Sequence, residues 1–359
     1  MVDSKTYSRK LVEYPFFSIC IPQYNRTSFL LELLRSLSEQ NFDSFEVCIS
    51  DDRSPDGRQD EVADFLEESG LSYIYKIQQE NCGYDENMRG AIELARGRYC
   101  FFMSNDDALA GPGALKDLKA SIEAHGSAGV IITDYEGYDA NERAYRVRET
   151  QNYGSGPRVA AEHFRDFSYV GGVLLDRAQA QERSTDKWDG SEMYQTLIGC
   201  QIIASGRSLL ELNDVPVQKD ISLPEEEVDS YAKRDPDSTI KERRIPLSQL
   251  GRVVSDAISP YTNSGQQRRL NEKILRQLLC FTYPFWLVEY RRVHSWKYAL
   301  GVALGMRPDI LAQGMDLNPV QRGRVNLLYL TATVAGLIFP ITAFDRLKPL
   351  FYRIAKTYF

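Results

Sequence analysis

The chain has 359 residues, 43% of them hydrophobic and 26% charged, which indicates a folded protein of about two domains and excludes a disordered chain. Its six cysteines show no CxxC or zinc-type spacing, which is typical of reduced thiols and excludes a disulfide scaffold. With three histidines, a histidine-rich metal site is not expected. The N-terminal residues contain no apolar signal-peptide core, which favours a cytoplasmic protein.

The net charge of -7 conceals two parts of opposite sign. Residues 241–359 carry 18 Lys and Arg against 7 Asp and Glu, a net charge of +11, which leaves -18 for residues 1–240. An acidic first part argues against nucleic acid as its partner. A basic second part suggests an anionic membrane face or lipid-linked phosphates, although an unevenly charged, solvated surface would give the same count.

Predicted strands and helices alternate along the first part of the chain. In order, the apolar and amphipathic runs predict a strand at 16–21, a helix at 28–40, a strand at 45–49, a helix at 60–68, a strand at 71–77, a helix at 86–95, a strand at 99–103, a helix at 111–125 and a strand at 128–133. Short connections between alternating elements predict an α/β fold, with a mostly parallel sheet flanked by helices.

The stretch after residue 133 is polar at first and then apolar. Residues 139–157 are polar and suit a mobile loop. A strand at 169–175 follows, in which Gly171 and Gly172 would let a substrate approach the backbone closely. An apolar helix comes next, preceded by Asp186, Trp188, Asp189 and Glu192.

Polar residues follow three of the predicted strands. These loops have the sequences PQYNR (22–26), SDDRSPDG (50–57) and SNDD (104–107). Because open α/β sheets bind ligands at the carboxyl ends of their strands, we expect the three loops to form one nucleotide site. Neither GxGxxG nor GxxxxGK[ST] is present, which disfavours a dinucleotide oxidoreductase and a P-loop.

The adjacent acids Asp106 and Asp107 are the candidate metal ligands. Two carboxylates at the end of a strand repel each other and attract a cation, and oxygen donors with an open side suit Mg²⁺ or Mn²⁺ on a diphosphate. The alternative is that both acids merely open the next helix, as cap and first-turn residues.

The combined motifs resemble those of family 2 glycosyltransferases of GT-A fold, in particular abequosyltransferase-like bacterial sugar transferases. The matching segments are FSICIPQYNR, EVCISDDRSPDG, NCGYDENMRGAIELARGRY and FFMSNDD, within residues 15–110, and a looser likeness extends to about residue 212. The resemblance implies that Asp51 contacts the base and that Asp106 is the metal ligand, with Asp107 as the backup ligand. In this DxD-like motif Ser104 stands where the family has the first acid. The other donor-binding residues that it implies are Pro22, Tyr24, Asn25, Asp52, Asn81 and Asn105.

Two further roles are predicted around this site. An inverting transfer needs a carboxylate to deprotonate the acceptor hydroxyl, and Glu192 is the first candidate, with Asp189 the second. Alternatively these two acids form a capping box, with Asp189 as N-cap. Arg89 could reach a phosphate or lie in solvent. Trp188 could stack on a sugar or pack the helix against the core.

We place a domain boundary near residue 240. Residues 1–240 would form the glycosyltransferase domain, with nucleotide-binding (15–110) and acceptor (111–240) halves, and residues 241–359 a helical, basic, membrane-associating region. The uncharged stretch 325–344 is close to the minimum length for a membrane span. An interfacial or re-entrant helix, a span and a soluble core helix are all considered.

These features predict a metal-dependent, inverting glycosyltransferase of hexosyl or deoxyhexosyl type. It would move a sugar from a nucleotide-sugar to a hydroxyl of a glycan, lipid-linked at the inner face of the cell membrane, in surface polysaccharide synthesis. The alternatives are a degenerate nucleotide-sugar-binding scaffold, suggested by Ser104, and a sugar nucleotidyltransferase. The latter is disfavoured because PQYNRTS lacks the glycines that would hold a triphosphate.

Overall fold

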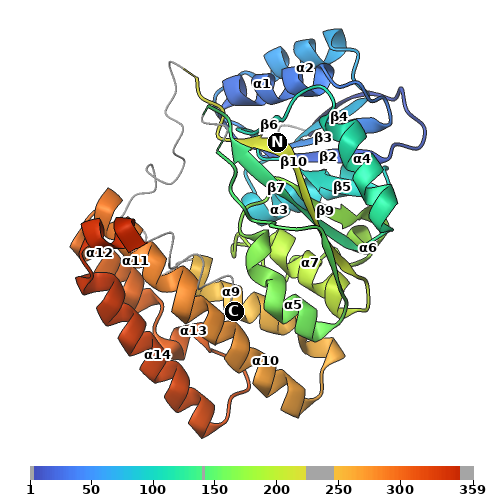
Figure 1. Ribbon diagram of the computed structural model, residues 1–359. Coiled ribbons are helices and arrows are strands. Elements are labelled where there is room, and N and C mark those ends of the chain that lie inside the picture. The colour runs from blue at the N-terminus through green and yellow to red at the C-terminus, as the bar shows by residue number, and fades with distance from the viewer. Residues whose placement is uncertain (1–3, 140–141, 224–245, 348–359) are drawn as a thin grey trace. The chain divides into compact units, whose positions relative to one another are not determined.

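The computed structural model describes residues 4–139, 142–223 and 246–347 (Figure 1). The chain divides into two compact units, residues 1–228 and 229–359. The boundary expected near residue 240 lies outside the described residues.

The first unit begins with the expected alternation of strands and helices. Its elements are β2 (Phe17–Gln23), α1 (Thr27–Ser38), β3 (Phe45–Asp51), α2 (Gln59–Glu68), β4 (Tyr73–Ile77), α3 (Tyr84–Leu94) and β5 (Tyr99–Phe102). Strands β2, β3 and β5 are buried along almost their whole length because helices cover the sheet, which explains their continuous apolar runs. The leucines of α1, spaced at helical intervals, pack into the same core.

The second half of this unit contains more strands than the sequence suggested. Its elements are β6 (Ala108–Leu109), α4 (Ala114–His125), β7 (Val130–Gly137), β8 (Gln151–Gly154), α5 (Pro157–His163), the 3₁₀ turn η1 (Phe164–Phe167), β9 (Val173–Asp176), α6 (Arg177–Glu182), α7 (Tyr194–Ala204) and β10 (Leu209–Lys219). The interpretation of 139–157 as one mobile loop is therefore wrong in part, since β8 pairs with β10.

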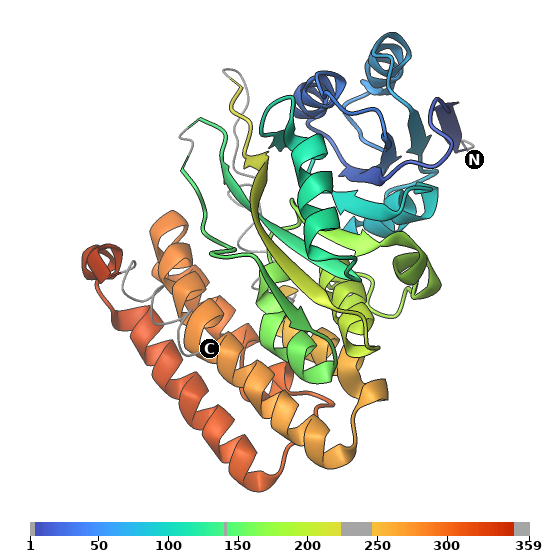
Figure 2. The same ribbon diagram turned by 45° about the vertical axis from the view of Figure 1, so that its right-hand side comes forward.

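All ten strands form one sheet, shown in two views in Figures 1 and 2. The order is β1-β4-β3-β2-β5-β9-β7-β10-β6, and β8 pairs with β10. Strands β2, β3, β4 and β5 are mutually parallel, β9 runs against both β5 and β7, and β7 is parallel to β10. Six strands therefore share one direction, which confirms the mostly parallel α/β fold. The edge strand β1 (Lys5–Arg9) was not predicted.

The C-terminal unit is helical, as expected. It contains α9 (Pro246–Ile258), a 3₁₀ turn (Ser259–Tyr261), α10 (Ser264–Gln277), a π-helical turn (Leu278–Thr282), α11 (Tyr283–Val293), α12 (Trp296–Gly305), α13 (Pro308–Leu311) and α14 (Pro319–Ile338). Among the described residues no single helix has the length and hydropathy to cross a membrane. Helix α14 and the segment Ile341–Leu347 meet that standard only together, across a bend of 109°.

Candidate active site

The loop that follows β2 has an unusual backbone conformation. Asn25 and Arg26 adopt left-handed φ angles of 55° and 61° immediately before α1, and such a conformation costs a non-glycine residue about 1–2 kcal/mol. The N–H of Asn25 donates to the Ser54 hydroxyl at 2.9 Å, which ties this loop to the loop after β3. Tyr24 is 45% exposed, and Pro22 lies half-buried in β2.

Asp51, at the end of β3, is buried and shapes its own loop. The N–H of Ser54 donates to its Oδ1 at 2.7 Å, and the Tyr75 hydroxyl donates to its Oδ2 at 2.9 Å. Burial raises the pKa of Asp51 against the opposing effect of these hydrogen bonds. Both carboxylate oxygens therefore have partners within the protein.

Asp52 holds the loop that precedes α3. Its two carboxylate oxygens accept the N–H groups of Cys82 and Gly83 at 2.6 and 2.9 Å. Burial again raises the pKa, here of the Asp52 carboxyl. The exposed Asn81 immediately precedes these anchored residues, so Asp52 brings the loop that carries Asn81 to the end of β3.

The loop after β5 reaches across the end of β2. The side-chain amide of Asn105 donates to the side-chain oxygen of Gln23 at 2.8 Å and to the backbone oxygen of Asn25 at 3.2 Å. The guanidinium of Arg26 donates to Asp106 at 2.7 Å, and these two side chains are 21% and 14% exposed. The three predicted loops are thus linked by side-chain contacts at the carboxyl ends of β3, β2 and β5.

Asp107 lies behind Asp106 in the protein interior. Its Oδ1 accepts the N–H of Asp220 at 3.3 Å, whereas its Oδ2 is buried and has no hydrogen-bond partner among the described residues. Burial, together with the neighbouring Asp106, raises the pKa of Asp107 to about 7. Because Asp107 is 1% exposed, Asp106 is the acid that faces the end of the sheet.

The two glycines before β9 have a different role from the one expected. A Cβ on Gly171 would lie 2.5 Å from the Tyr169 hydroxyl, and one on Gly172 would lie 2.3 Å from the Thr133 hydroxyl. Arg146 also packs there, donating to the backbone oxygens of Tyr169 and Gly171 at 2.8 Å. The expected approach of a substrate to this backbone is wrong, because side chains of the chain itself fill the space.

Arg89 and Asp189 form a bidentate ion pair between α3 and the segment before α7. The two guanidinium nitrogens lie 2.8 and 2.9 Å from the two carboxylate oxygens, and one of them also donates to the Thr185 oxygen at 3.1 Å. Hydrogen bonding to Asp189 raises the pKa of Arg89. Arg89 is therefore neither solvated nor directed at a phosphate, and both oxygens of Asp189 are occupied.

Glu192 lies just before α7, which begins at Tyr194. Its φ is 60°, and its N–H donates to the buried carboxylate of Asp85 at 2.8 Å. The N–H of Tyr194 donates to the other oxygen of Asp85 at 3.0 Å. The capping-box alternative is wrong, because α7 starts four residues later than it requires and is capped by Asp85 from α3, without a cap from the Met193 side chain.

Strained backbone marks the ends of the site's elements. Six described non-glycine residues have left-handed φ angles, and five of them lie at loops that follow β2, β3 or β10 or precede α7: Asn25, Arg26, Arg53, Glu192 and Asp220. Such conformations persist where the surrounding structure enforces them and are concentrated at functional sites. These left-handed residues therefore lie in or beside the same loops as the candidate site side chains.

Several residues of this site were missed by sequence reasoning. Gln23 and Arg26 lie within the recognised PQYNR segment but were given no role. Asp85 was given no role. Lys219 and Asp220 form an ion pair at the end of β10, beside Asp107, and β10 itself was not predicted. Only the position of Arg26 within that segment could have signalled a role.

The mostly parallel sheet flanked by helices has the arrangement of the GT-A fold. Residues 18–177 match the family model described as glycosyl transferase family 2. This part of the N-terminal unit is therefore similar to family 2 glycosyltransferases, as the motifs had implied.

Individual relatives cover only part of this chain. It is 41% identical over 96 residues to the abequosyltransferase RfbV of Salmonella typhimurium, spanning 26% of this chain and 28% of that protein. It is 28% identical over 104 residues to a GalNAc(5)-diNAcBac-PP-undecaprenol beta-1,3-glucosyltransferase of Campylobacter jejuni, spanning 29% and 33%. The crystal structure of Staphylococcus aureus TarS residues 1–349 with UDP shares the fold, with a TM-score of 0.57 and 17% identity over 88% of this chain and 90% of that one.

Proposed function

We propose that this protein transfers a sugar from a nucleotide-sugar to a hydroxyl of a glycan acceptor, with inversion at the anomeric carbon. The observation that carries the proposal is the linkage of three loops at the ends of β3, β2 and β5, through Asn25–Ser54, Asn105–Gln23 and Arg26–Asp106. These loops lie within residues 18–177, the part of the chain that matches the glycosyltransferase family model. We assign binding of the nucleotide to Asp51, Asp52 and Asn81.

The residues after β5 fit a divalent cation. Asp106 offers a partly exposed carboxylate, and Asp107 behind it has a buried oxygen with no hydrogen bond among the described residues. Hard oxygen donors of this kind suit Mn²⁺ or Mg²⁺. Asp106 would hold the ion, with Asp107 as the second ligand, and a bound cation would neutralise the departing diphosphate. Arg26 would then release Asp106 and become available to the phosphates.

Glu192 is assigned as the base that takes the proton of the acceptor hydroxyl. Its backbone is fixed by Asp85, whereas Asp189 has both oxygens bound to Arg89. A positioned general base contributes about 10²–10⁴ in rate. The ion pair of Asp189 instead ties α3 to the segment that carries Glu192, so Asp189 and Arg89 are positioning residues in this proposal.

The C-terminal unit is assigned to the membrane surface. Helix α14 exposes five large apolar residues, each more than half exposed: Val320, Leu327, Leu330, Val334 and Ile338. At about 100° per residue they fall within an arc of roughly 80°, so they form one stripe, here called the α14 stripe. The net charge of +11 over residues 241–359 favours an anionic lipid surface. The protein would reach a lipid-linked acceptor at that surface. The Campylobacter relative is named for an acceptor of this kind, a glycan on PP-undecaprenol.

A donor panel tests the proposed activity. The full chain is incubated with UDP-, GDP-, CDP- and dTDP-sugars and Mn²⁺, and donor hydrolysis or transfer is measured for the wild type and for Asp106→Asn. We expect turnover with one donor and a loss of about 10²–10³ in kcat for the variant. Asp64→Asn, on an exposed position of α2, is the matched control. Nucleotide binding without turnover of any donor would favour a scaffold instead.

A further inference from the structure

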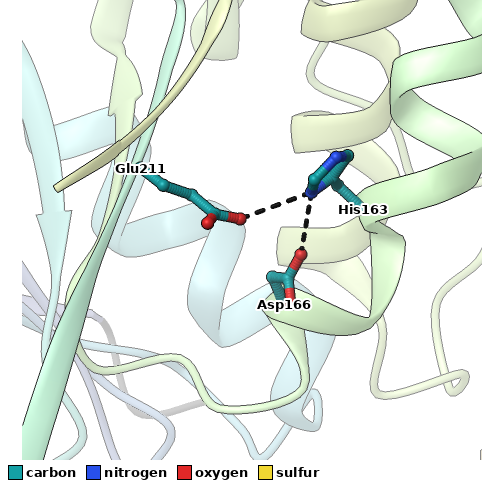
Figure 3. Close-up of side chains that lie close together, drawn as sticks. All are labelled: His163, Asp166 and Glu211. Carbon is teal, nitrogen blue, oxygen red and sulfur yellow. Dashed lines mark hydrogen bonds and ion pairs between the residues drawn. The ribbon is translucent and has the colours of Figure 1, made fainter. Parts of the chain in front are cut away.

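A second group of ligand-type side chains lies far from the nucleotide loops (Figure 3). His163 ends α5, Asp166 lies in η1, and Glu211 lies near the start of β10. Lys219 stands eight residues further along β10, which corresponds to about 26 Å of extended strand. In Figure 3 both carboxylates point toward the same ring nitrogen of His163. The group is therefore distinct from the site around Asp106.

The distances within this group are longer than those of a strong charged hydrogen bond. The Nδ1 of His163 lies 3.2 Å from an Asp166 oxygen and 3.3 Å from a Glu211 oxygen. Charged N–H···O hydrogen bonds are about 2.7–2.9 Å long. Ligand atoms placed tetrahedrally about a zinc ion, at about 2.0–2.1 Å from the metal, lie about 3.3–3.4 Å apart. The two distances are close to that tetrahedral edge.

Charge and burial agree with a divalent ion. The side chains of His163, Asp166 and Glu211 are 17%, 29% and 9% exposed, so the group is largely desolvated but open on the Asp166 side. A metal ion bound to Nδ1 displaces the proton of the imidazole, so the three ligands then carry a net charge of -2, which one divalent cation neutralises. The ring of Tyr153 packs on that of His163 with centroids 4.0 Å apart and fixes the orientation of the imidazole. Such outer contacts commonly orient metal-binding histidines.

We propose that His163, Asp166 and Glu211 bind a zinc ion, with water completing the tetrahedron. One nitrogen and two carboxylate oxygens plus water match zinc's preference for four ligands of mixed N and O type. The three residues come from α5, η1 and β10, so the ion ties the α5–η1 corner to the strand that leads to Lys219 and Asp220. A bound ion would stabilise this part of the fold by joining the three elements.

Metal binding is measured on the full chain without any sugar donor. After EDTA treatment and dialysis, the protein is titrated with Zn²⁺ by equilibrium dialysis, and Co²⁺ is added separately to record the visible absorption of a tetrahedral site. We expect one zinc ion per chain and an intense Co²⁺ band. His163→Gln should weaken zinc binding by at least about tenfold and abolish the band. Zinc should also raise the Tm of the wild type but not that of the variant.

Matched variants separate this site from other sources of binding. His125→Gln removes an exposed histidine of α4 and should leave zinc binding unchanged. Any zinc that is lost in Asp106→Asn is assigned to the nucleotide loops, and the zinc that depends on His163 should remain in that variant. If His163→Gln does not fold, as judged by circular dichroism, Asp166→Asn changes a more exposed ligand and should show the same loss. The proposal is overturned if the wild type binds no zinc at micromolar concentrations, or if folded His163→Gln or Asp166→Asn binds it as the wild type does.

Discussion

At the scale of single residues, we expect Arg26 to compete with the proposed cation for Asp106. The guanidinium lies 2.7 Å from the carboxylate and above the Phe29 ring, with its centre 4.4 Å from the centroid. Arg26→Gln removes this counter-charge, so we expect Mn²⁺ to bind about tenfold more tightly, as measured by electron paramagnetic resonance titration. Arg35→Gln, an exposed position of α1, should leave the affinity unchanged. Weaker Mn²⁺ binding in Arg26→Gln would mean that Asp106 does not hold the metal.

Glu192 and Asp189 should respond differently to neutralisation. Glu192→Gln should lower kcat by about 10²–10⁴ and leave the affinity for nucleoside diphosphate unchanged, because the base acts on the acceptor alone. Asp189→Asn should mainly lower stability, because Arg89 loses its charged partner. Steady-state kinetics and nucleotide-induced thermal shifts measure both effects. If the kcat of Glu192→Gln is within threefold of the wild-type value, Glu192 is not the base.

At the scale of elements, α7 depends on a cap from another helix. Asp85 accepts the N–H groups of Glu192 and Tyr194 and is 2% exposed. Asp85→Ala leaves both donors without this partner, so we expect a loss of about 1–3 kcal/mol in the free energy of unfolding, measured by urea denaturation. Asp64→Ala on the exposed side of α2 should change it by less than about 0.5 kcal/mol. Equal effects of the two substitutions would contradict this role of Asp85.

Helices α11 and α14 approach closely at Gly336. A Cβ there would lie 2.8 Å from Leu287 and 3.2 Å from the Pro284 oxygen. Gly336→Ala should therefore destabilise the C-terminal unit by about 1–3 kcal/mol. Gly323→Ala, on the same helix with nothing within 4 Å, should stabilise it by up to about 1 kcal/mol through helix propensity. Thermal unfolding of the two variants provides the comparison, and a Gly336→Ala protein as stable as Gly323→Ala would show that the helices are not packed this way.

At the scale of the whole molecule, the α14 stripe should govern lipid binding. Replacing Leu327 and Leu330 by Asn should reduce co-sedimentation with anionic vesicles by several-fold, because the stripe loses apolar area. Added salt should weaken binding of the wild type. The control is Leu11→Asn, which alters an equally exposed leucine of the other unit. Binding of the double variant equal to that of the wild type would exclude this surface.

The sequence by itself determined the class of fold, the positions of the first strands and helices, and the three loops that carry the family's motifs. It could do so because hydrophobic periodicity and turn residues are local properties, and because the carboxyl ends of parallel strands meet at one edge. Only the tertiary structure decided which side chains meet. The pairs Arg26–Asp106, Arg89–Asp189 and Asp85–Glu192 join residues 80 to 107 positions apart, and the group His163, Asp166 and Glu211 joins three elements. Strand β10 and its ion pair were missed for the same reason: its partners β6, β7 and β8 are distant in sequence, and no local pattern specifies such pairing.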